Sequence, residues 1–475
     1  MKFTGRQVVL VILIILLTQK IASEAAASEY KVEIFDHLCS EVNDEARYTS
    51  TKLKSLKYLT EGKNGFVFRS RDDFLENFGD EGSNYNGLKL LVDFLASKGT
   101  QLVMVYLPTR GLMNPYAAPS DRFDYSTALS SYLAKVEKLR QLGIVVPDMS
   151  SLLRQYQDTD FYFKRDIHWT PNGARKTAQL VAQTIKETGL IQPQSDYHYV
   201  STPVGSYTPR GFMQKGIKQL CGGQYVEEYV QGYNYESSNE TEGGALFADE
   251  PATEIVLLGT SFSALEQLNF AGFLQEGLGV PLENFSLPGG RDIGAWLSYI
   301  ENGDFSAHPP KVIIWEVPGY YLLDNPMSLA QILPFIRGAC EEQSVILEND
   351  LALTGQSRSS NALFFTQNML DVPLSEIVLD FDFSDKEIND IRFNIWYSNG
   401  KVKKGRVNKP ARANTGGRFV FSLYGHLLEP EGGVMSLELS GIEGQSVSNY
   451  LSEHGKHELN VHVKACRMPS NPIDN

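Results

Sequence analysis

The sequence predicts an α/β domain with a mostly parallel sheet and helices on both faces, followed by an all-β sandwich domain. Between about residues 85 and 320, short apolar strands alternate with amphipathic helices, which is typical of a parallel sheet covered on both faces. Beyond residue 340, short strands follow one another with only turns between them, as in a sandwich. A chain of 475 residues is also too long for one ordinary core.

The elements of the first domain follow from their apolar spacing and end signals. The helix expected at 170–189 has the fullest signals, with Thr170 as N-cap, Pro171 at the first position and Gly189 after the end. The segment 200–250 breaks the alternation and predicts a long ordered insertion or lid held by Cys221. The other helices are expected at 86–98, 126–142, 263–275 and 293–301, and the strands at 101–107, 144–146, 254–258, 284–287 and 311–315.

The second domain is expected to contain strands separated by turn residues such as Asn399-Gly400 and Gly432-Gly433. We place the domain boundary so that the first domain covers 28–345 and the second 346–475. The expected strands of the second domain are 376–383, 391–397, 418–423, 434–439 and 458–463.

The N-terminus has the order of a secretory signal: Lys2 and Arg6, then an apolar run at 8–17, then the small residues 25–27. The run is about half the roughly 20 residues that a spanning helix needs, so we predict a signal peptide at 1–27, with an uncleaved anchor as the alternative. The formal net charge of -14 argues against a general nucleic-acid binder.

Four cysteines fit an exported protein with two disulfides. Three pairings are possible, and we favour Cys39–Cys221 with Cys340–Cys466 because each pair would then cross-link one domain. No C-x-x-C spacing is present, so a metal or redox role is not expected.

Ser261 is the candidate nucleophile. The apolar run 255–258 is followed by Gly259-Thr260-Ser261 at the start of the next helix. Ligands of parallel sheets bind at the carboxyl ends of the strands, and the free N–H groups of a helix start can hold an oxyanion. Gly259 permits a sharp turn and leaves the approach open. A serine that simply caps the helix is the alternative interpretation.

His168 and Asp166 are the candidate base and orienting acid. They lie in the segment Arg165-Asp166-Ile167-His168-Trp169, immediately before a helix N-terminus. A hydroxyl needs an adjacent base to become a good nucleophile, and the imidazole must be oriented by a third group. A capping aspartate beside a structural histidine would give the same local pattern, but a strand-end serine in the same domain favours the catalytic interpretation.

Arg110 and Tyr321 are further candidates, because each follows a strand at the face where ligands bind. Either could contact an oxyanion or a sugar carboxylate, with loop packing as the alternative. In the second domain, residues 391–428 hold eight Lys or Arg and no Asp or Glu, with aromatic residues interleaved. Aromatic rings and cations together suit a polymer of acidic sugars, although a solvated basic face is also compatible.

These motifs resemble the AlgX family of periplasmic alginate O-acetyltransferases, which carry an SGNH-hydrolase-like domain followed by a carbohydrate-binding module. The resemblance spans essentially the whole chain, including 61–68, Asp166-Ile167-His168-Trp169-Thr170, Gly259-Thr260-Ser261 and Trp315-Glu316-Val317-Pro318. The related AlgJ type shares the catalytic motifs and is not expected to carry the second domain. The resemblance implies Ser261 as the acetyl-carrying nucleophile, His168 as general base and Asp166 as the group that orients it.

The resemblance also implies that the polymer binds to the strand around Trp396 and to the basic turn after it. Arg392 and Asn394 stand where the family pattern has Lys and Thr, and Tyr320 stands where an Arg is expected beside the family tyrosine, which is best matched by Tyr321. The candidate polysaccharide-binding residues are Arg392, Asn394, Trp396, Lys401, Lys403, Lys404 and Arg406.

The resemblance therefore predicts O-acetylation of alginate, an acidic exopolysaccharide of mannuronate residues, in the periplasm, without metal, nucleotide or other cofactor. The acetyl group would come from a membrane-bound donor protein, and other polysaccharide biosynthesis and export proteins would be partners. Two alternatives use the same sequence features. One is a polysaccharide acetylesterase with the same triad, and the other is a non-catalytic polysaccharide-binding scaffold of an export complex.

Overall fold

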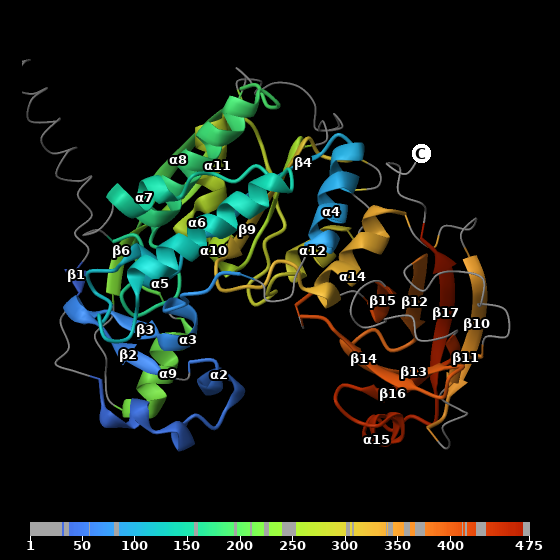
Figure 1. Ribbon diagram of the computed structural model, residues 1–475. Helices are drawn as coiled ribbons and strands as arrows, with labels where there is room; N and C mark the ends of the chain where they lie inside the picture. The colour runs from blue at the N-terminus through green and yellow to red at the C-terminus, as the bar shows by residue number, and fades with distance from the viewer. Residues whose placement is uncertain are drawn as a thin grey trace, which may run out of the picture.

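The computed structural model shows two domains side by side, an α/β domain and a β domain (Figure 1). The signal predicted at 1–27 lies outside the described residues. No helix in the described part of the chain is long and apolar enough to cross a membrane. The structure describes residues 31–32, 38–56, 58–79, 85–155, 160–193, 197–209, 211–222, 228–239, 253–300, 305, 308–338, 340, 345–355, 362–365, 376–410, 412–413, 416–423 and 434–468.

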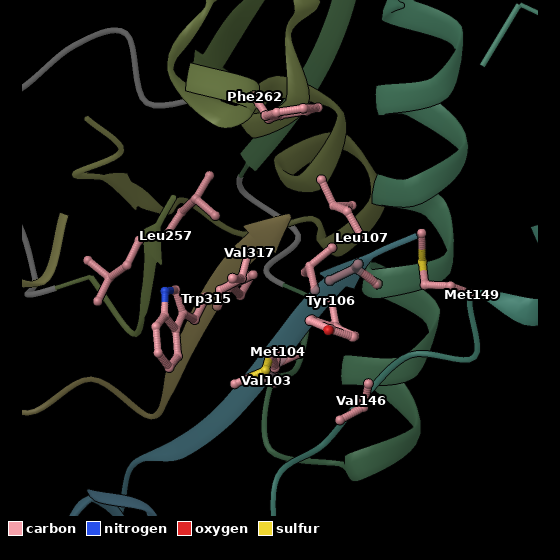
Figure 2. Close-up of a cluster of buried hydrophobic side chains, with 14 of the residues drawn as sticks. Val103, Met104, Tyr106, Leu107, Val146, Met149, Leu257, Phe262, Trp315 and Val317 are labelled. Carbon is pink, nitrogen blue, oxygen red and sulfur yellow. The ribbon is translucent and has the colours of Figure 1, made fainter. Parts of the chain in front are cut away.

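The centre of the first domain is a parallel sheet with the strand order β4-β9-β7-β8. Its central strands are buried almost throughout, because helices cover both faces. Figure 2 shows part of this core, with Met104 on β4 beside Trp315 on β9 and Leu257 of β7 on the far side of β9. The predicted parallel sheet is confirmed. The four strands are β4 (Gln101–Leu107), β9 (Val312–Pro318), β7 (Ile255–Leu258) and β8 (Glu283–Asn284).

The helices of this domain largely match their predicted positions. At α8 the Thr170 hydroxyl accepts from the Gly173 N–H, and Gly189 ends the helix in the left-handed region with φ 72°. The helices are α2 (Thr51–Lys54), α3 (Ser70–Asp73), α4 (Asn86–Ser97), α5 (Arg110–Met113), α6 (Tyr125–Gln141), α7 (Ser150–Gln155), α8 (Pro171–Thr188), α9 (Phe212–Cys221), α10 (Ser261–Ala264), α11 (Phe270–Leu278), α12 (Gly294–Ile300) and α14 (Pro326–Ile336).

Three predictions in this domain were wrong in detail. The single helix expected at 263–275 is broken into α10, a 3-10 turn at Glu266–Leu268, and α11. The break arises because Leu265 is extended and Asn269 is left-handed, with φ 56°. The strand expected at 284–287 is reduced to β8, and the strand at 144–146 to one parallel bridge between Val145 and Val103.

The segment expected to be a lid contains an antiparallel ribbon, with α9 lying between its two strands in the sequence. These strands, β5 (Tyr197–Tyr207) and β6 (Glu228–Asn239), pair along their length, and the short β1 (Lys31–Val32) adds to the other edge of β6. Residues 240–250 of the predicted insertion lie outside the described residues. Cys221 at the end of α9 is bonded to Cys39, with Cα atoms 5.4 Å apart, as predicted.

The second domain is a sandwich of two four-stranded antiparallel sheets, ordered β10-β17-β12-β15 and β11-β16-β13-β14. Its apolar core lies between them. Cys340 is bonded to Cys466 on β17, the second predicted pair. The five predicted strands are present, while β10, β11, β14 and α15 were not foreseen. The elements are β10 (Val345–Leu353), β11 (Ala362–Phe365), β12 (Ile377–Phe383), β13 (Asp390–Tyr397), β14 (Val402–Asn408), β15 (Arg418–Ser422), β16 (Val434–Ile442), α15 (Val447–Glu453) and β17 (Leu459–Arg467).

Candidate active site

Ser261 lies at the carboxyl end of β7, as its place in the sequence predicts. The preceding turn is so crowded that a Cβ on Gly259 would lie 2.8 Å from Glu316 Oε2, so only glycine fits without displacing its neighbours. The Thr260 hydroxyl accepts from the Phe262 N–H at 3.3 Å and caps α10. Thr260 is therefore the capping residue, and the interpretation of Ser261 as a simple helix cap was wrong.

The structure brings Ser261, His168 and Asp166 into one hydrogen-bonded chain. His168 Nε2 is 2.8 Å from Ser261 Oγ, and His168 Nδ1 is 2.5 Å from Asp166 Oδ1. The same Asp166 oxygen accepts from the His168 backbone N–H at 3.1 Å, which closes a tight local turn. Asp166 is fully buried and His168 is 8% exposed. These distances permit proton transfer from the serine to the imidazole.

The loop that carries Asp166 is held by two buried charged residues. Glu228, on β6, accepts from the backbone N–H groups of Lys164 at 2.7 Å and Arg165 at 3.0 Å. Arg110 donates from Nη2 to the carbonyl oxygens of Phe163 and Lys164, each at 2.8 Å. Nothing in the local sequence of Glu228 signals this role, because the contact joins residues more than 60 positions apart.

The prediction of Arg110 as an oxyanion or substrate contact was wrong. Its side chain is 2% exposed, and Nη1 also donates to Val67 O at 2.7 Å and to Asp73 Oδ2 at 2.9 Å. Both terminal nitrogens are thus committed to protein acceptors. Arg110 still acts on the site at a distance, since its positive charge favours the ionised form of Asp166.

Asp166 is held as a carboxylate in spite of its burial. Burial would raise the pKa of this carboxyl, but the charge of His168, the hydrogen bonds from His168 and the charge of Arg110 together hold the pKa below its ordinary value. An ionised Asp166 can accept from the Nδ1–H of His168, which leaves Nε2 free to accept a proton from Ser261.

The second oxygen of Asp166 points at the beginning of α9. Oδ2 is buried and has no hydrogen-bond partner among the described residues, and a Cβ on Gly211 would lie 1.5 Å from it. Gly211 is the N-cap of α9, so the positive end of the helix dipole faces the carboxylate. The absence of a side chain at Gly211 is what gives Asp166 its space.

Tyr321 lies half-buried near the same end of the sheet. Burial and the charge of Asp292 are the main causes that raise the pKa of its phenol, to about 12, so it remains a hydrogen-bond donor at neutral pH. Its neighbour Tyr320 stacks under the Arg69 guanidinium, 4.7 Å from the ring centroid. The predicted contact of Tyr321 with an oxyanion or substrate is compatible with this position and stays a prediction.

In the second domain, three of the predicted polysaccharide-binding residues share the outward face of β13. Arg392, Asn394 and Trp396 alternate with buried residues along the strand. Their partners on β14 place Arg406 opposite Arg392 and Lys404 opposite Asn394. These five residues therefore form one basic face, which we call the β13–β14 face.

Glu438 on β16 and Asp390 on β13 hold parts of this face in place. Glu438 Oε2 accepts from Trp396 Nε1 at 3.1 Å and from Asn394 Nδ2 at 3.3 Å. Arg406 forms a two-pronged ion pair with Asp390, with both distances 2.8 Å. Lys403 pairs in register with the buried Ile395, so it lies on the other side of β14, and Lys401 lies at the turn before the strand.

The comparisons with known proteins agree with this architecture. Residues 59–319 match the family described as "SGNH hydrolase-like domain, acetyltransferase AlgX", and residues 339–474 match a C-terminal carbohydrate-binding module. The chain belongs to the AlgX family. It is 33% identical over 426 residues to the alginate biosynthesis protein AlgX of Pseudomonas syringae pv. tomato, covering 89% of this chain and 88% of that protein.

Two further relatives cover different shares of the chain. The solved structure of Pseudomonas aeruginosa AlgX superimposes with a TM-score of 0.77 at 30% identity, and it covers 91% of this chain and 100% of that one. The probable alginate O-acetylase AlgJ of Azotobacter vinelandii is 31% identical over 241 residues, which is 48% of this chain and 60% of that protein.

In this AlgX-family chain, a loop of the first domain contacts the end of β14. Arg291 Nη2 donates to the carbonyl oxygen of Asn408 at 3.0 Å and to its side-chain oxygen at 3.1 Å. A few residues earlier, the Leu287 N–H donates to Gly259 O at 3.0 Å. One short segment thus joins the turn beside Ser261 to the strand that carries Lys404 and Arg406.

The described residues of this AlgX-family chain contain no group of three or more His, Cys, Asp or Glu that could hold a metal ion. Close to Ser261, the side chains of His168, Thr260 and Ser263 are hydrogen-bonded, while Asp166 Oδ2 and Ser286 Oγ have no partner among the described residues. The distances between Ser261, His168 and Asp166 permit proton transfer and attack by the serine oxygen.

Proposed function

We propose that this protein is a periplasmic O-acetyltransferase that acetylates an acidic exopolysaccharide, alginate at its mannuronate residues, through an acetyl-Ser261 intermediate. The observation that supports this most is the 2.8 Å contact between His168 Nε2 and Ser261 Oγ at the carboxyl edge of a parallel sheet. Membership of the AlgX family and the appended carbohydrate-binding module support an acetyl acceptor that is a polysaccharide.

In the first step, His168 takes the proton of Ser261 and the serine oxygen attacks the acetyl carbonyl of the donor. The N–H groups of Phe262 and Ser263 already donate to Thr260, so among the described groups at the start of α10 the Ser261 N–H is the donor that we assign to the negative oxygen. As the carbon–oxygen bond of the donor breaks, His168 returns its proton to the leaving group. Asp166 keeps the imidazole oriented and stabilises its positive charge during the step.

In the second step, a mannuronate hydroxyl replaces the leaving group. His168 takes the hydroxyl proton, the sugar oxygen attacks acetyl-Ser261, and the proton returns to Ser261 Oγ as the ester bond to the serine breaks. The donor is an acetyl group relayed by a membrane-bound partner, since acetyl-CoA is a cytoplasmic metabolite.

The β13–β14 face would hold the polymer. Arg392 and Lys404 offer cations for sugar carboxylates, and Trp396 offers an aromatic surface, whereas the charge of Arg406 is paired with Asp390. The indole N–H of Trp396 is held by Glu438, which fixes the ring on the outward side of the sheet. The contact between Arg291 and Asn408 would keep this face in a constant position relative to Ser261.

The experiment is an acetyl-transfer assay with oligomannuronate as acceptor and p-nitrophenyl acetate as donor, with the products analysed by mass spectrometry. We expect acetylated oligosaccharide from the unaltered chain, none from Ser261→Ala, and normal amounts from Ser126→Ala, an exposed serine on α6. Release of free acetate alone would favour the acetylesterase. Normal alginate acetylation in cells that carry Ser261→Ala would favour the non-catalytic scaffold.

A further inference from the structure

Glu316 lies directly beneath the turn that presents Ser261. It is in β9, which pairs in parallel with β7 so that Leu258 lies opposite Trp315. This register places the next residue, Glu316, beside the Gly259–Thr260 turn. The side chain of Glu316 is fully buried, and its carboxyl is in contact range of the position that a Cβ of Gly259 would take.

The carboxyl of Glu316 bonds to residues on both sides of the nucleophile. Oε2 accepts from the Thr260 N–H at 2.7 Å and from the Ser263 hydroxyl at 3.0 Å. The Thr260 hydroxyl also lies 3.1 Å from Oε2 and 3.2 Å from Oε1. Ser261 is therefore enclosed between two residues that are tied to one carboxyl.

Among the described ion pairs, none joins a lysine or arginine to Glu316. A buried carboxyl without a cationic partner is costly to ionise, and such groups concentrate at functional sites. Burial raises the pKa of Glu316 to about 7, while the bonds from Thr260 and Ser263 and the charge of His168 act in the opposite direction. Among the described titratable groups, His168 and Tyr321 interact electrostatically with Glu316.

We propose that Glu316 is a positioning residue for acyl transfer: its carboxyl fixes the turn that presents Ser261, and its negative charge stabilises the imidazolium form of His168. The proton that leaves Ser261 creates a positive charge on His168, and a carboxylate within electrostatic reach favours that charge. This inference rests on the proposed role of Ser261 as the nucleophile. In this proposal two acids act on His168: Asp166, which lies in the same loop, and Glu316, which lies on β9 of the sheet.

A merely structural role would need only a hydrogen-bond acceptor, which a glutamine supplies. Glu316→Gln keeps the length of the side chain and an oxygen for the Thr260 N–H, and removes the charge. Ser263→Ala keeps the charge but removes one of the hydrogen bonds that stabilise the carboxylate. The two variants therefore separate the effect of the negative charge of Glu316 from the effect of its hydrogen bonds.

The test measures the rate at which phenylmethylsulfonyl fluoride labels Ser261 between pH 5 and 9, because this reaction needs the activated serine and no acetyl donor. We expect Glu316→Gln to lower the maximal labelling rate by about tenfold or more. We also expect the acid limb of the rate–pH curve, where the rate falls as pH decreases, to move to lower pH. Both effects follow from the loss of the carboxylate. Ser263→Ala should move the acid limb to higher pH, because the Glu316 carboxyl loses a hydrogen bond and is then protonated more readily. Glu254→Gln changes a half-buried acid that precedes β7 at the opposite end of the sheet and pairs with Lys311, and it should match the unaltered chain.

The inference is overturned if Glu316→Gln, folded by its thermal midpoint, retains both the rate and the acid limb of the unaltered chain. If Glu316→Gln does not fold, an acid limb that stays in place in Ser263→Ala overturns it. The proposed function is tested separately by acetyl transfer to oligomannuronate. If labelling depends on Glu316 but no acetyl transfer is found, the transferase function is refuted and the role of Glu316 stands. If acetyl transfer is found and Glu316→Gln labels at the normal rate, only the role of Glu316 is refuted.

Discussion

Trp169 donates from its indole Nε1 to the backbone carbonyl of Phe262 at 3.0 Å, one residue beyond Ser261. Trp169 itself follows His168 directly, so this bond ties together two segments that are 93 positions apart in the sequence. The indole is fully buried, and its ring packs against those of Phe262 and Phe270. Trp169 thus connects the residue that follows Ser261 to the segment that carries His168.

Trp169→Phe should slow the labelling of Ser261 several-fold and lower the free energy of unfolding. A phenylalanine fills much of the space but leaves the Phe262 carbonyl without its donor, a loss of about 1 kcal/mol beyond the packing term. Denaturant unfolding and the labelling rate are the measurements. Trp296→Phe is the matched control, since Trp296 is equally buried and its Nε1 has no partner in the described structure. Equal effects of the two substitutions on labelling would refute the role of the bond.

Gly211→Ala should reduce the labelling of Ser261 by about tenfold or more, because Asp166 must move to make room for a methyl group. A displaced Asp166 can no longer hold the imidazole of His168 in its present orientation. Lys215→Ala, an exposed position on the same helix, should leave the rate unchanged. A folded Gly211→Ala protein that is labelled at the normal rate would contradict the requirement for glycine beside Asp166 Oδ2.

The disulfide between Cys39 and Cys221 is expected to support the site through α9. Cys221 is the last residue of α9, and the first turn of this helix faces Asp166. Replacing both cysteines by serine should lower the thermal midpoint and slow labelling, because the helix loses its covalent link to the N-terminal segment. The corresponding replacement of Cys340 and Cys466 should lower stability while labelling stays normal. Identical effects of the two double variants on labelling would contradict this account.

The stability of the protein should depend on pH through Glu316. Its pKa is raised from an ordinary value of 4.5 to about 7, so between these values the folded protein holds a proton that the unfolded chain has released. The free energy of unfolding should therefore fall as pH rises from about 4.5 to 7. Urea unfolding across this range should show that Glu316→Gln lacks this part of the decrease. A parallel pH dependence in both proteins would count against the raised pKa.

Lys404→Ala should weaken binding of oligomannuronate to the full chain several-fold and reduce the salt dependence of binding. Lys404 is exposed on the β13–β14 face, where its charge lies beside Arg406 and opposite Asn394. Lys456→Ala removes a lysine that is paired with Asp385 elsewhere in the domain, so it is the matched control. Titration calorimetry at two salt concentrations measures both quantities. Equal loss in both variants would indicate that binding follows overall charge rather than this face.

The sequence was sufficient for features that depend on local patterns. The apolar runs placed β4, β7 and β9, and the end signals at Thr170 and Gly189 bounded α8. The same kind of reasoning chose Ser261, His168 and Asp166, because a strand end and a helix start are recognisable without tertiary contacts. Both disulfide pairs were also predicted, but with a domain boundary at 345 the pair Cys340–Cys466 links the two domains instead of cross-linking one.

What the sequence did not predict depends on contacts between distant segments. Glu228 and Gly211 support the site from β6 and α9, and their neighbours in the sequence give no sign of it. Glu316 lies in a motif of the family resemblance, but its contact with the Thr260 turn is seen only in the structure. The prediction for Arg110 was wrong for the same reason. Its position at a strand end indicated a ligand contact, but its guanidinium donates to Asp73 and to backbone carbonyl oxygens from distant segments. The strand β14 was missed because its lysines and arginine have low strand propensity and pairing with β13 overrides it.

The most direct test of the central claim is the fate of an acetyl group on Ser261. The chain is mixed briefly with p-nitrophenyl acetate, and the peptide that contains Ser261 is analysed by tandem mass spectrometry with and without a chase of oligomannuronate. We predict an acetyl group on Ser261 that disappears in the chase as acetylated sugar forms. An acetyl group that never resides on Ser261, or one that leaves only as acetate in the presence of the sugar, would contradict the account.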